Sequence, residues 1–215
     1  MTVHKPGLAI LPALLLCSAA GAPHAKPQKL GPSFDCARAA GAIETMICSS
    51  EELSAYDRAL GIAFAHAEDR AETARKQRAW LNEDRARCGD ADCLAGAYAD
   101  RLDDLAQFPA SDWGTEYVSR SAQGTLQIAP IGGGWYMFAA SATWEYAHHT
   151  TTNFGDAAGV IRPVAGRAEF HRDCDLTFER LSGDRWRIRD VGADDNRCGG
   201  VNVNMTGIYV RKKRS

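Results

Sequence analysis

The chain has 215 residues, of which 45% are hydrophobic and 24% are charged, so it is long enough for one large or two small globular domains. Its 25 basic and 27 acidic side chains leave a net charge of −2, which argues against a nucleic-acid partner. Apolar runs in the sequence are shorter than the roughly 18 residues that a membrane-spanning helix needs. We therefore expect no transmembrane segment.

Residues 1–22 have the pattern of a secretory signal peptide. His4 and Lys5 precede an apolar core at residues 8–16, and small residues follow at 18–22. A leader peptidase accepts small side chains at its cleavage site, and the final Ala-Gly-Ala of this run meets that requirement. The segment predicts a periplasmic or secreted protein.

Export places the start of the mature chain near Pro23, followed by a linker over residues 23–33. Cys17 raises the alternative of a lipid anchor, because lipoprotein signals end at a modified cysteine. Such signals have a small residue directly before that cysteine, whereas Leu16 stands there in this chain. The sequence therefore disfavours lipidation at this position.

Six cysteines remain after Cys17, and they predict three structural disulfides. They are Cys36, Cys48, Cys88, Cys93, Cys174 and Cys198. Thiols pair in the oxidising compartment that an exported chain enters, and their spacing is not that of paired zinc ligands. The distribution along the sequence predicts two bridges among the first four cysteines and one bridge between the last two.

Residues 34–107 predict a helical domain, because helix-forming residues dominate and β-branched residues are few. Apolar positions within residues 53–67 recur every three or four residues, which is the spacing of one helix face. Ser49 and Glu52 form a capping-box pattern, in which the serine oxygen accepts an N–H of the first helical turn. A long helix should therefore begin near Ser50.

Three further helical segments are expected around this helix. A short one precedes it at residues 43–48, a long one follows at 73–87, and the last covers 91–106 with Asp90 as its N-cap. We expect the long segments to form an antiparallel hairpin that turns near Arg70.

The predicted hairpin determines which of the first four cysteines would lie close enough to pair. Residues equally distant from the turn become neighbours, so Cys48 would lie opposite the segment from Cys88 to Cys93. This arrangement favours nested bridges, Cys48–Cys88 and Cys36–Cys93. Local bridges, Cys36–Cys48 and Cys88–Cys93, remain the alternative. Either set would stabilise a unit that is small enough to have a thin core.

Residues 34–107 also contain a series of motif residues in a recognisable order. They are Phe34-Asp35-Cys36, Ile43-Glu44, Met46-Ile47-Cys48, Glu52-Leu53, Tyr56-Asp57-Arg58, Gln77-Arg78-Ala79-Trp80-Leu81, Arg85, Cys88, Cys93, Leu94, Tyr98 and Arg101-Leu102. With this series the segment resembles the N-terminal domain of the LprI-type lysozyme-inhibitor family. The resemblance implies an exported helical module that binds a lysozyme, and it assigns no contact residue.

Residues 108–215 predict an antiparallel β domain, because the composition changes to Thr, Val, Tyr, Trp and Gly in short alternating runs. The expected strands are 116–120, 124–129, 135–144, 159–163, 167–171, 175–181, 185–190 and 207–211. Eight short strands separated by turn residues indicate a small barrel or sandwich. The whole chain is therefore predicted to be an α+β protein, with Cys174–Cys198 tying one edge of the β domain.

Two candidate metal sites in residues 108–215 lack the arrangement of ligands that a metal ion needs. His148 and His149 are adjacent in a predicted strand and point to opposite faces, so they do not form one site with His171. The segment that begins at Asp190 resembles a calcium loop, but it has Asp195 at the sixth position, where glycine is needed, and no glutamate at the twelfth. We expect neither a metal nor another cofactor.

Catalysis is not expected either. No pairing of a nucleophile with a base stands out, and cysteine nucleophiles are excluded if all six cysteines are bridged. The acidic turn residues Asp190, Asp194 and Asp195 are instead candidate contacts for a cationic partner.

Charge is divided unevenly along the chain. Residues 34–107 carry 15 acidic and nine basic side chains, a net charge of −6, whereas residues 108–215 have a net charge of +1. An acidic surface is steered toward basic partners, and animal-type lysozymes are strongly cationic. Together with the resemblance, this predicts a protein that binds and inhibits a lysozyme-like muramidase by occluding its cleft. The alternative is an envelope adaptor that binds another periplasmic protein or a cell-wall fragment through the β domain.

Overall fold

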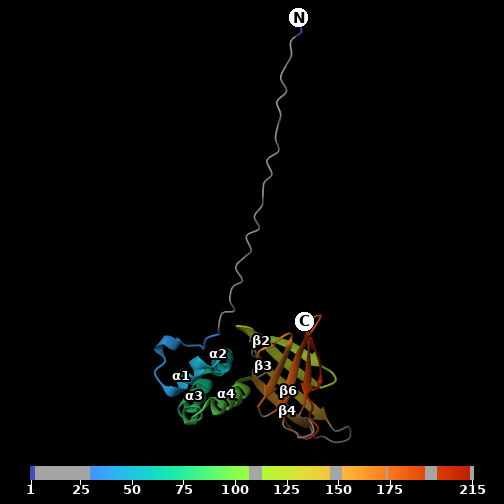
Figure 1. Cartoon of the computed structure of the whole chain (residues 1–215). Coiled ribbons are helices and arrows are strands. Elements are labelled where there is room, and N and C mark those ends of the chain that lie inside the picture. The colour runs from blue at the N-terminus through green and yellow to red at the C-terminus, as the bar shows by residue number, and fades with distance from the viewer. Residues whose placement is uncertain (3–29, 107–112, 146–151, 173, 192–197, 214–215) are drawn as a thin grey trace.

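The computed structural model describes residues 1–2, 30–106, 113–145, 152–172, 174–191 and 198–213. The helical segments are η1 (Cys36–Arg38), α1 (Ala42–Ser49), α2 (Glu51–Ala65), α3 (Arg70–Asn82), η2 (Arg85–Arg87) and α4 (Ala91–Ala106). The strands are β1 (Thr115–Ser119), β2 (Gly124–Gly132), β3 (Trp135–Glu145), β4 (Thr152–Ile161), β5 (Arg167–His171), β6 (Asp175–Leu181), β7 (Arg185–Asp190) and β8 (Gly207–Arg211). The predicted α+β class is confirmed, with the helices beside a strand barrel (Figure 1).

None of the helices in these ranges is both long and apolar enough to cross a membrane. Residues 3–22 of the predicted signal peptide, with Cys17 among them, and most of the linker lie outside the described residues. So does the boundary between the two predicted domains at residues 107–112.

The long helix α2 begins where the sequence predicts, at Glu51, but its cap differs from the expected one. The side-chain oxygen of Ser50 accepts a hydrogen bond from the backbone N–H of Leu53, at 3.2 Å. Ser49 belongs to the end of α1, where its hydroxyl donates to the carbonyl of Met46 at 2.9 Å. The capping serine is therefore one residue later than the sequence pattern predicts, because α1 and α2 are separated by a single residue.

For the helix predicted at residues 73–87, both predicted ends are wrong. Helix α3 begins three residues earlier, where Asp69 caps its first turn, and it ends at Asn82, before the separate turn η2. The last helix, α4, has its predicted bounds, and the carboxylate of Asp90 accepts the N–H of Cys93 at 2.8 Å. A side chain that caps a free N–H fixes a helix start locally. The prediction used this signal at Asp90 and missed the same signal at Asp69.

Helix α2 packs chiefly against α4, so the simple hairpin turning near Arg70 is not confirmed. The rings of Tyr56 on α2 and Tyr98 on α4 lie with their centroids 6.3 Å apart. Helix α3 joins them through Trp80, whose ring meets Tyr98 edge to face at 5.1 Å. Residues Tyr56, Trp80 and Tyr98 form the aromatic centre of the helical part.

The strands form one antiparallel sheet in the order β4-β3-β2-β1-β8-β7-β6-β5. The first and last strands of the chain pair in its middle, with Val118 opposite Val210. Strands β5 to β8 have their predicted bounds, whereas β4 begins at Thr152, well before the predicted start. The sheet curls into a nearly closed barrel, which decides between the barrel and the sandwich that the sequence left open (Figure 1).

Aromatic side chains fill the barrel where its two edge strands approach each other. The ring of Phe138 on β3 lies 5.0 Å from that of Phe170 on β5 and 4.7 Å from that of Phe178 on β6. Gly159 on the edge strand β4 leaves space for Phe170, because a Cβ at this position would overlap the ring. The absence of a side chain at Gly159 is therefore what lets the two edges come together.

The helices cover the outer face of β2, β3 and β4, and they share a hydrophobic core with it (Figure 1). The strand residues in this shared core are Ala129, Ile131, Met137, Ala158 and Val160. A second core fills the barrel interior. Burial of the shared apolar surface is what holds the helical part on the barrel.

Candidate functional site

The structure contains three disulfides within the described residues. They are Cys36–Cys48, Cys88–Cys93 and Cys174–Cys198. The expected bridge between the last two cysteines is confirmed, whereas the favoured nested pairing is wrong and the local alternative holds. The nested pairing assumed that residues equally distant from Arg70 face each other, and this fails because α2 packs mainly on α4.

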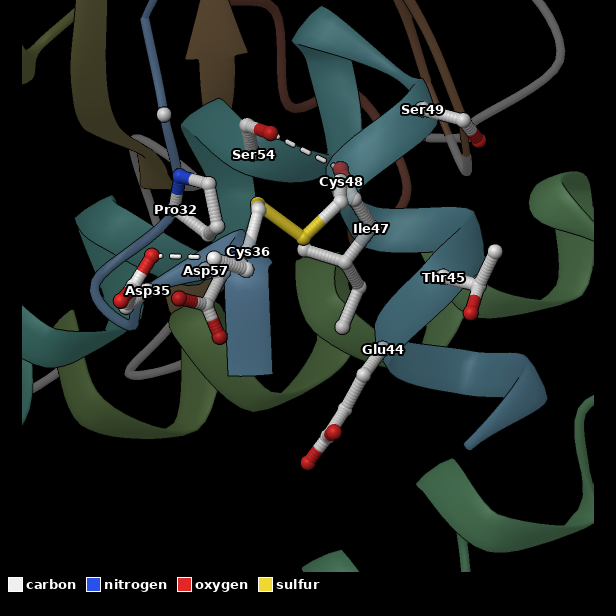
Figure 2. Close-up of a disulfide and its surroundings, with 12 residues drawn as sticks. Pro32, Asp35, Cys36, Glu44, Thr45, Ile47, Cys48, Ser49, Ser54 and Asp57 are labelled. Atoms are coloured by element: carbon white, nitrogen blue, oxygen red, sulfur yellow. Dashed lines mark hydrogen bonds between the residues drawn. A yellow bond between two sulfur atoms is a disulfide. The ribbon is translucent and has the colours of Figure 1, made fainter. Parts of the chain in front are cut away.

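Figure 2 shows the Cys36–Cys48 bridge, which ties η1 to α1. The carboxylate of Asp35 accepts the N–H of Ala37 at 3.0 Å and so caps η1. Ser54 on α2 donates its hydroxyl to the carbonyl of the buried Ile47 at 2.8 Å. The bridge and these hydrogen bonds therefore join η1, α1 and α2 into one rigid corner.

Asp57 anchors the chain that leads into this corner. Its carboxylate accepts hydrogen bonds from the backbone N–H of Ser33 at 2.7 Å and from the hydroxyl of Ser33 at 2.6 Å. The other oxygen accepts the hydroxyl of Tyr98 at 2.9 Å, and Arg58 donates to the carbonyl of Gly31 at 3.1 Å. Burial raises the pKa of the Tyr98 hydroxyl above its usual range, so Tyr98 is a neutral donor to the carboxylate.

A second polar network holds α3 against α4. The indole N–H of Trp80 donates to the carbonyl of Ala97 at 3.2 Å. Arg101, whose side chain is only 5% exposed, donates to Gln77 at 3.0 Å and to Asp104 at 3.3 Å. Many residues that carry the LprI-type resemblance are thus explained as scaffold, since they cap, anchor or pack the helices.

The helical part meets the barrel through a set of ion pairs that the sequence reasoning did not predict, here called the junction pairs. Arg172, which follows β5, donates to Glu52 on α2 at 2.9 Å and to Asp92 on α4 at 2.7 Å. Arg162, which follows β4, pairs with Glu51 at 2.5 Å. These contacts join residues more than 70 positions apart, so no local pattern could have indicated them.

Burial distinguishes the two arginines of the junction pairs. The Arg172 side chain is 17% exposed, and it lies close to the buried Tyr56, whose hydroxyl pKa is raised by burial. Partial burial acts to lower the pKa of Arg172, but its hydrogen bonds to Asp92 and Glu52 outweigh this effect and raise it. Arg172 therefore carries a permanent positive charge against the N-terminal turns of α2 and α4.

The junction pairs use only part of the acidic excess of the helical part. Adding Arg162 and Arg172 to residues 34–107 changes the net charge from −6 to −4. Glu68 and Glu83 are exposed and make no ion pair with a described residue. The helical part therefore presents a negatively charged surface to solvent.

Of the three predicted partner-binding residues, the structure describes Asp190 alone. Asp190 is the last residue of β7 and is 9% exposed, and its carboxylate accepts the N–H of Met205 at 3.4 Å. Its side chain faces inward because it continues the buried register of Trp186 and Ile188. Asp194 and Asp195 lie outside the described residues.

Of the three histidines considered as metal ligands, His148 and His149 lie outside the described residues. His171 ends β5 with its side chain 60% exposed, and it contacts the carboxylates of Asp175 at 2.8 Å and Glu169 at 3.3 Å. Hydrogen bonds to Asp175 and then to Glu169 raise the pKa of the imidazole above its ordinary value of 6.5. Within the described residues, no group of three or more His, Cys, Asp or Glu side chains could hold a metal ion.

A row of outward arginines on β7 is a further feature that sequence reasoning missed. Arg185, Arg187 and Arg189 alternate with the buried Trp186 and Ile188. The signal was visible in the sequence, because charged and apolar residues alternate with the period of a strand. Nothing in the sequence placed the row beside other arginines.

No protein-family model, curated protein or solved structure matches this chain. The resemblance of residues 34–107 to the LprI-type family therefore stays a prediction from the motif residues.

Proposed function

We propose that the protein binds and inhibits a lysozyme-like muramidase by occluding its cleft, and that the helical part makes the contact. The observation that carries the proposal is the charge of −4 that the helical part keeps after the junction pairs are counted. A negative surface attracts a cationic lysozyme over a distance of roughly one Debye length, about 8–10 Å at ordinary salt. The motif residues and the predicted export point to the same function.

The Cys88–Cys93 loop is the element that we propose to enter the cleft. It is closed by a disulfide, and its residues from Gly89 to Cys93 are exposed. Asp90 holds the loop from within by accepting the N–H of Cys93. A loop that is already ordered loses little conformational entropy on binding, which favours tight occlusion.

The test is binding of the oxidised protein to an animal-type lysozyme by calorimetry at low and moderate salt, with muramidase activity measured on the same samples. We expect roughly one-to-one binding that salt weakens and that abolishes turnover. The variant Glu68→Gln/Glu83→Gln should bind more weakly, whereas the control Glu145→Gln, on an exposed strand end of the barrel, should bind as the unaltered protein does. Unchanged turnover in a large molar excess of the protein would refute the proposal for that enzyme.

The alternative is an envelope adaptor that binds through the β domain. It is favoured by the β7 arginines, which point outward from the barrel. The helices cover a different face, that of β2, β3 and β4. Cutting the chain near residue 108 is a poor test, because it would expose the apolar core that the helices share with the sheet. Point variants distinguish the two functions. Binding of an adaptor partner should survive Glu68→Gln/Glu83→Gln and fail when the β7 arginines are replaced.

A further inference from the structure

We propose that the outer face of β7 binds a linear, phosphodiester-linked anionic polymer. The three outward arginines, Arg185, Arg187 and Arg189, lie in one line on a single strand. Side chains on one face of a strand repeat every two residues, so the arginines start about 7 Å apart. Successive phosphates of an extended phosphodiester chain lie at a comparable separation. Each phosphate of a straight polymer can therefore bind one arginine of the row.

Residues on the neighbouring strands β6 and β5 extend the row of β7 arginines into a shallow basic hollow. Arg187 on β7 is opposite Glu179 on β6, which in turn is opposite Arg167 on β5. Thr177 lies opposite Arg189 and contributes to the same hollow. Arg167, Arg187 and Arg189 thus lie around the carboxylate of Glu179. A second carboxylate, that of Glu169, lies opposite Thr177 at the border of the hollow and contacts His171. The three arginines still outnumber these two carboxylates, and the excess of positive charge favours an anionic ligand.

The internal partners of these arginines leave charge available for a ligand. Arg187 pairs with Glu179 at 2.6 Å, and Arg185 donates to the carbonyl of Ser182 at 3.0 Å. Arg167 and Arg189 are exposed and form no ion pair with any described residue. A guanidinium presents a planar fork of donors that suits phosphate oxygens, and it stays charged at any physiological pH.

The other side of the row is apolar. Ile208 and Val210 on β8 are 42% and 48% exposed, and they lie opposite Arg187 and Arg185. This arrangement suits a chain of phosphates joined by carbon linkers, because the charged groups can meet the arginines while the linkers cover the aliphatic side chains. An acidic protein surface would have to supply the same regular spacing of charges, so the polymer is the better match.

This inference does not depend on the proposed muramidase inhibition. The polymer is expected on the barrel, whereas the lysozyme is expected on the acidic helical part, which would repel a polyanion. Either function can therefore fail while the other holds.

The test is binding of poly(glycerol phosphate) to the full, oxidised chain, measured over a range of salt concentrations. The variant Arg167→Gln/Arg189→Gln should lower the affinity at least about tenfold and reduce the slope of log affinity against log salt by about one to two, as expected for two lost phosphate contacts. The matched control Arg38→Gln/Arg78→Gln removes two exposed arginines of the helical part that form no ion pair with a described residue, and it should change neither value. Circular dichroism verifies that both variants are folded.

Three results would overturn the inference. The first is a lack of binding by the unaltered protein at low salt, and the second is an equal loss of affinity in the two double variants, which would indicate attraction by net charge alone. The third is equal binding of poly-glutamate, which would show that the face does not select phosphate. Stronger polymer binding by Glu179→Gln would support it, because this change removes the carboxylate that competes for Arg187.

Discussion

Replacing Arg172 with methionine tests how much the junction pairs stabilise the protein. Methionine keeps an unbranched apolar stem but removes the hydrogen bonds to Glu52 and Asp92. The two carboxylate side chains are 47% and 91% exposed, so water can solvate them again when the arginine is lost. The cost should therefore approach that of two surface pairs, about 0.2–1 kcal/mol each, and not the roughly 3–5 kcal/mol of a broken buried pair.

Because the Arg172 side chain as a whole is mostly buried, we expect Arg172→Met to lower the free energy of unfolding by about 1–2 kcal/mol. Urea unfolding at low salt measures this change. The control Arg162→Met breaks a pair whose two side chains are 41% and 36% exposed, and it should cost less than about 1 kcal/mol. High salt should reduce the difference between the unaltered protein and Arg172→Met.

A double-mutant cycle with Glu52→Gln isolates the contact between Arg172 and Glu52 from other effects of either change. A coupling energy of zero, or an Arg172→Met variant as stable as the unaltered protein, would refute the reasoning. The helical part would then be held on the barrel by the shared apolar core alone.

Three other measurements test the remaining parts of the structure. Gly159→Ala should destabilise the protein by about 1–3 kcal/mol in urea unfolding, because the added methyl group overlaps a core phenylalanine ring; unchanged stability would contradict the proposed closure of the barrel. Tyr98→Phe should cost about 1–2 kcal/mol, since Asp57 loses one donor, and a neutral effect would show that this hydrogen bond is not stabilising. By NMR titration, His171 should have a pKa above 6.5 that falls in Asp175→Asn. Because the folded pKa is the higher one, the stabilisation is present at low pH and is lost as the pH rises through it.

Sequence alone determined most of the secondary structure of this protein, because the signals for it are local. The start of α4 depends on Asp90 and the N–H groups of the next turn, and its predicted bounds are correct. Strands β5 to β8 were also found, since alternating burial and nearby turn residues act over a few positions. At α3 the local capping signal of Asp69 was missed, and nothing within the segment indicated an end at Asn82.

Only the tertiary structure decided which distant residues meet. The nested disulfide pairing fails because α2 packs on α4, which no periodicity in the sequence indicates. The burial of Asp190 depends on the register of β7 in a curled sheet, and the contacts of Arg172 with α2 and α4 depend on helices seated on the barrel. Each of these outcomes is set by packing between elements far apart in the chain, and that is information which a local pattern of residues does not carry.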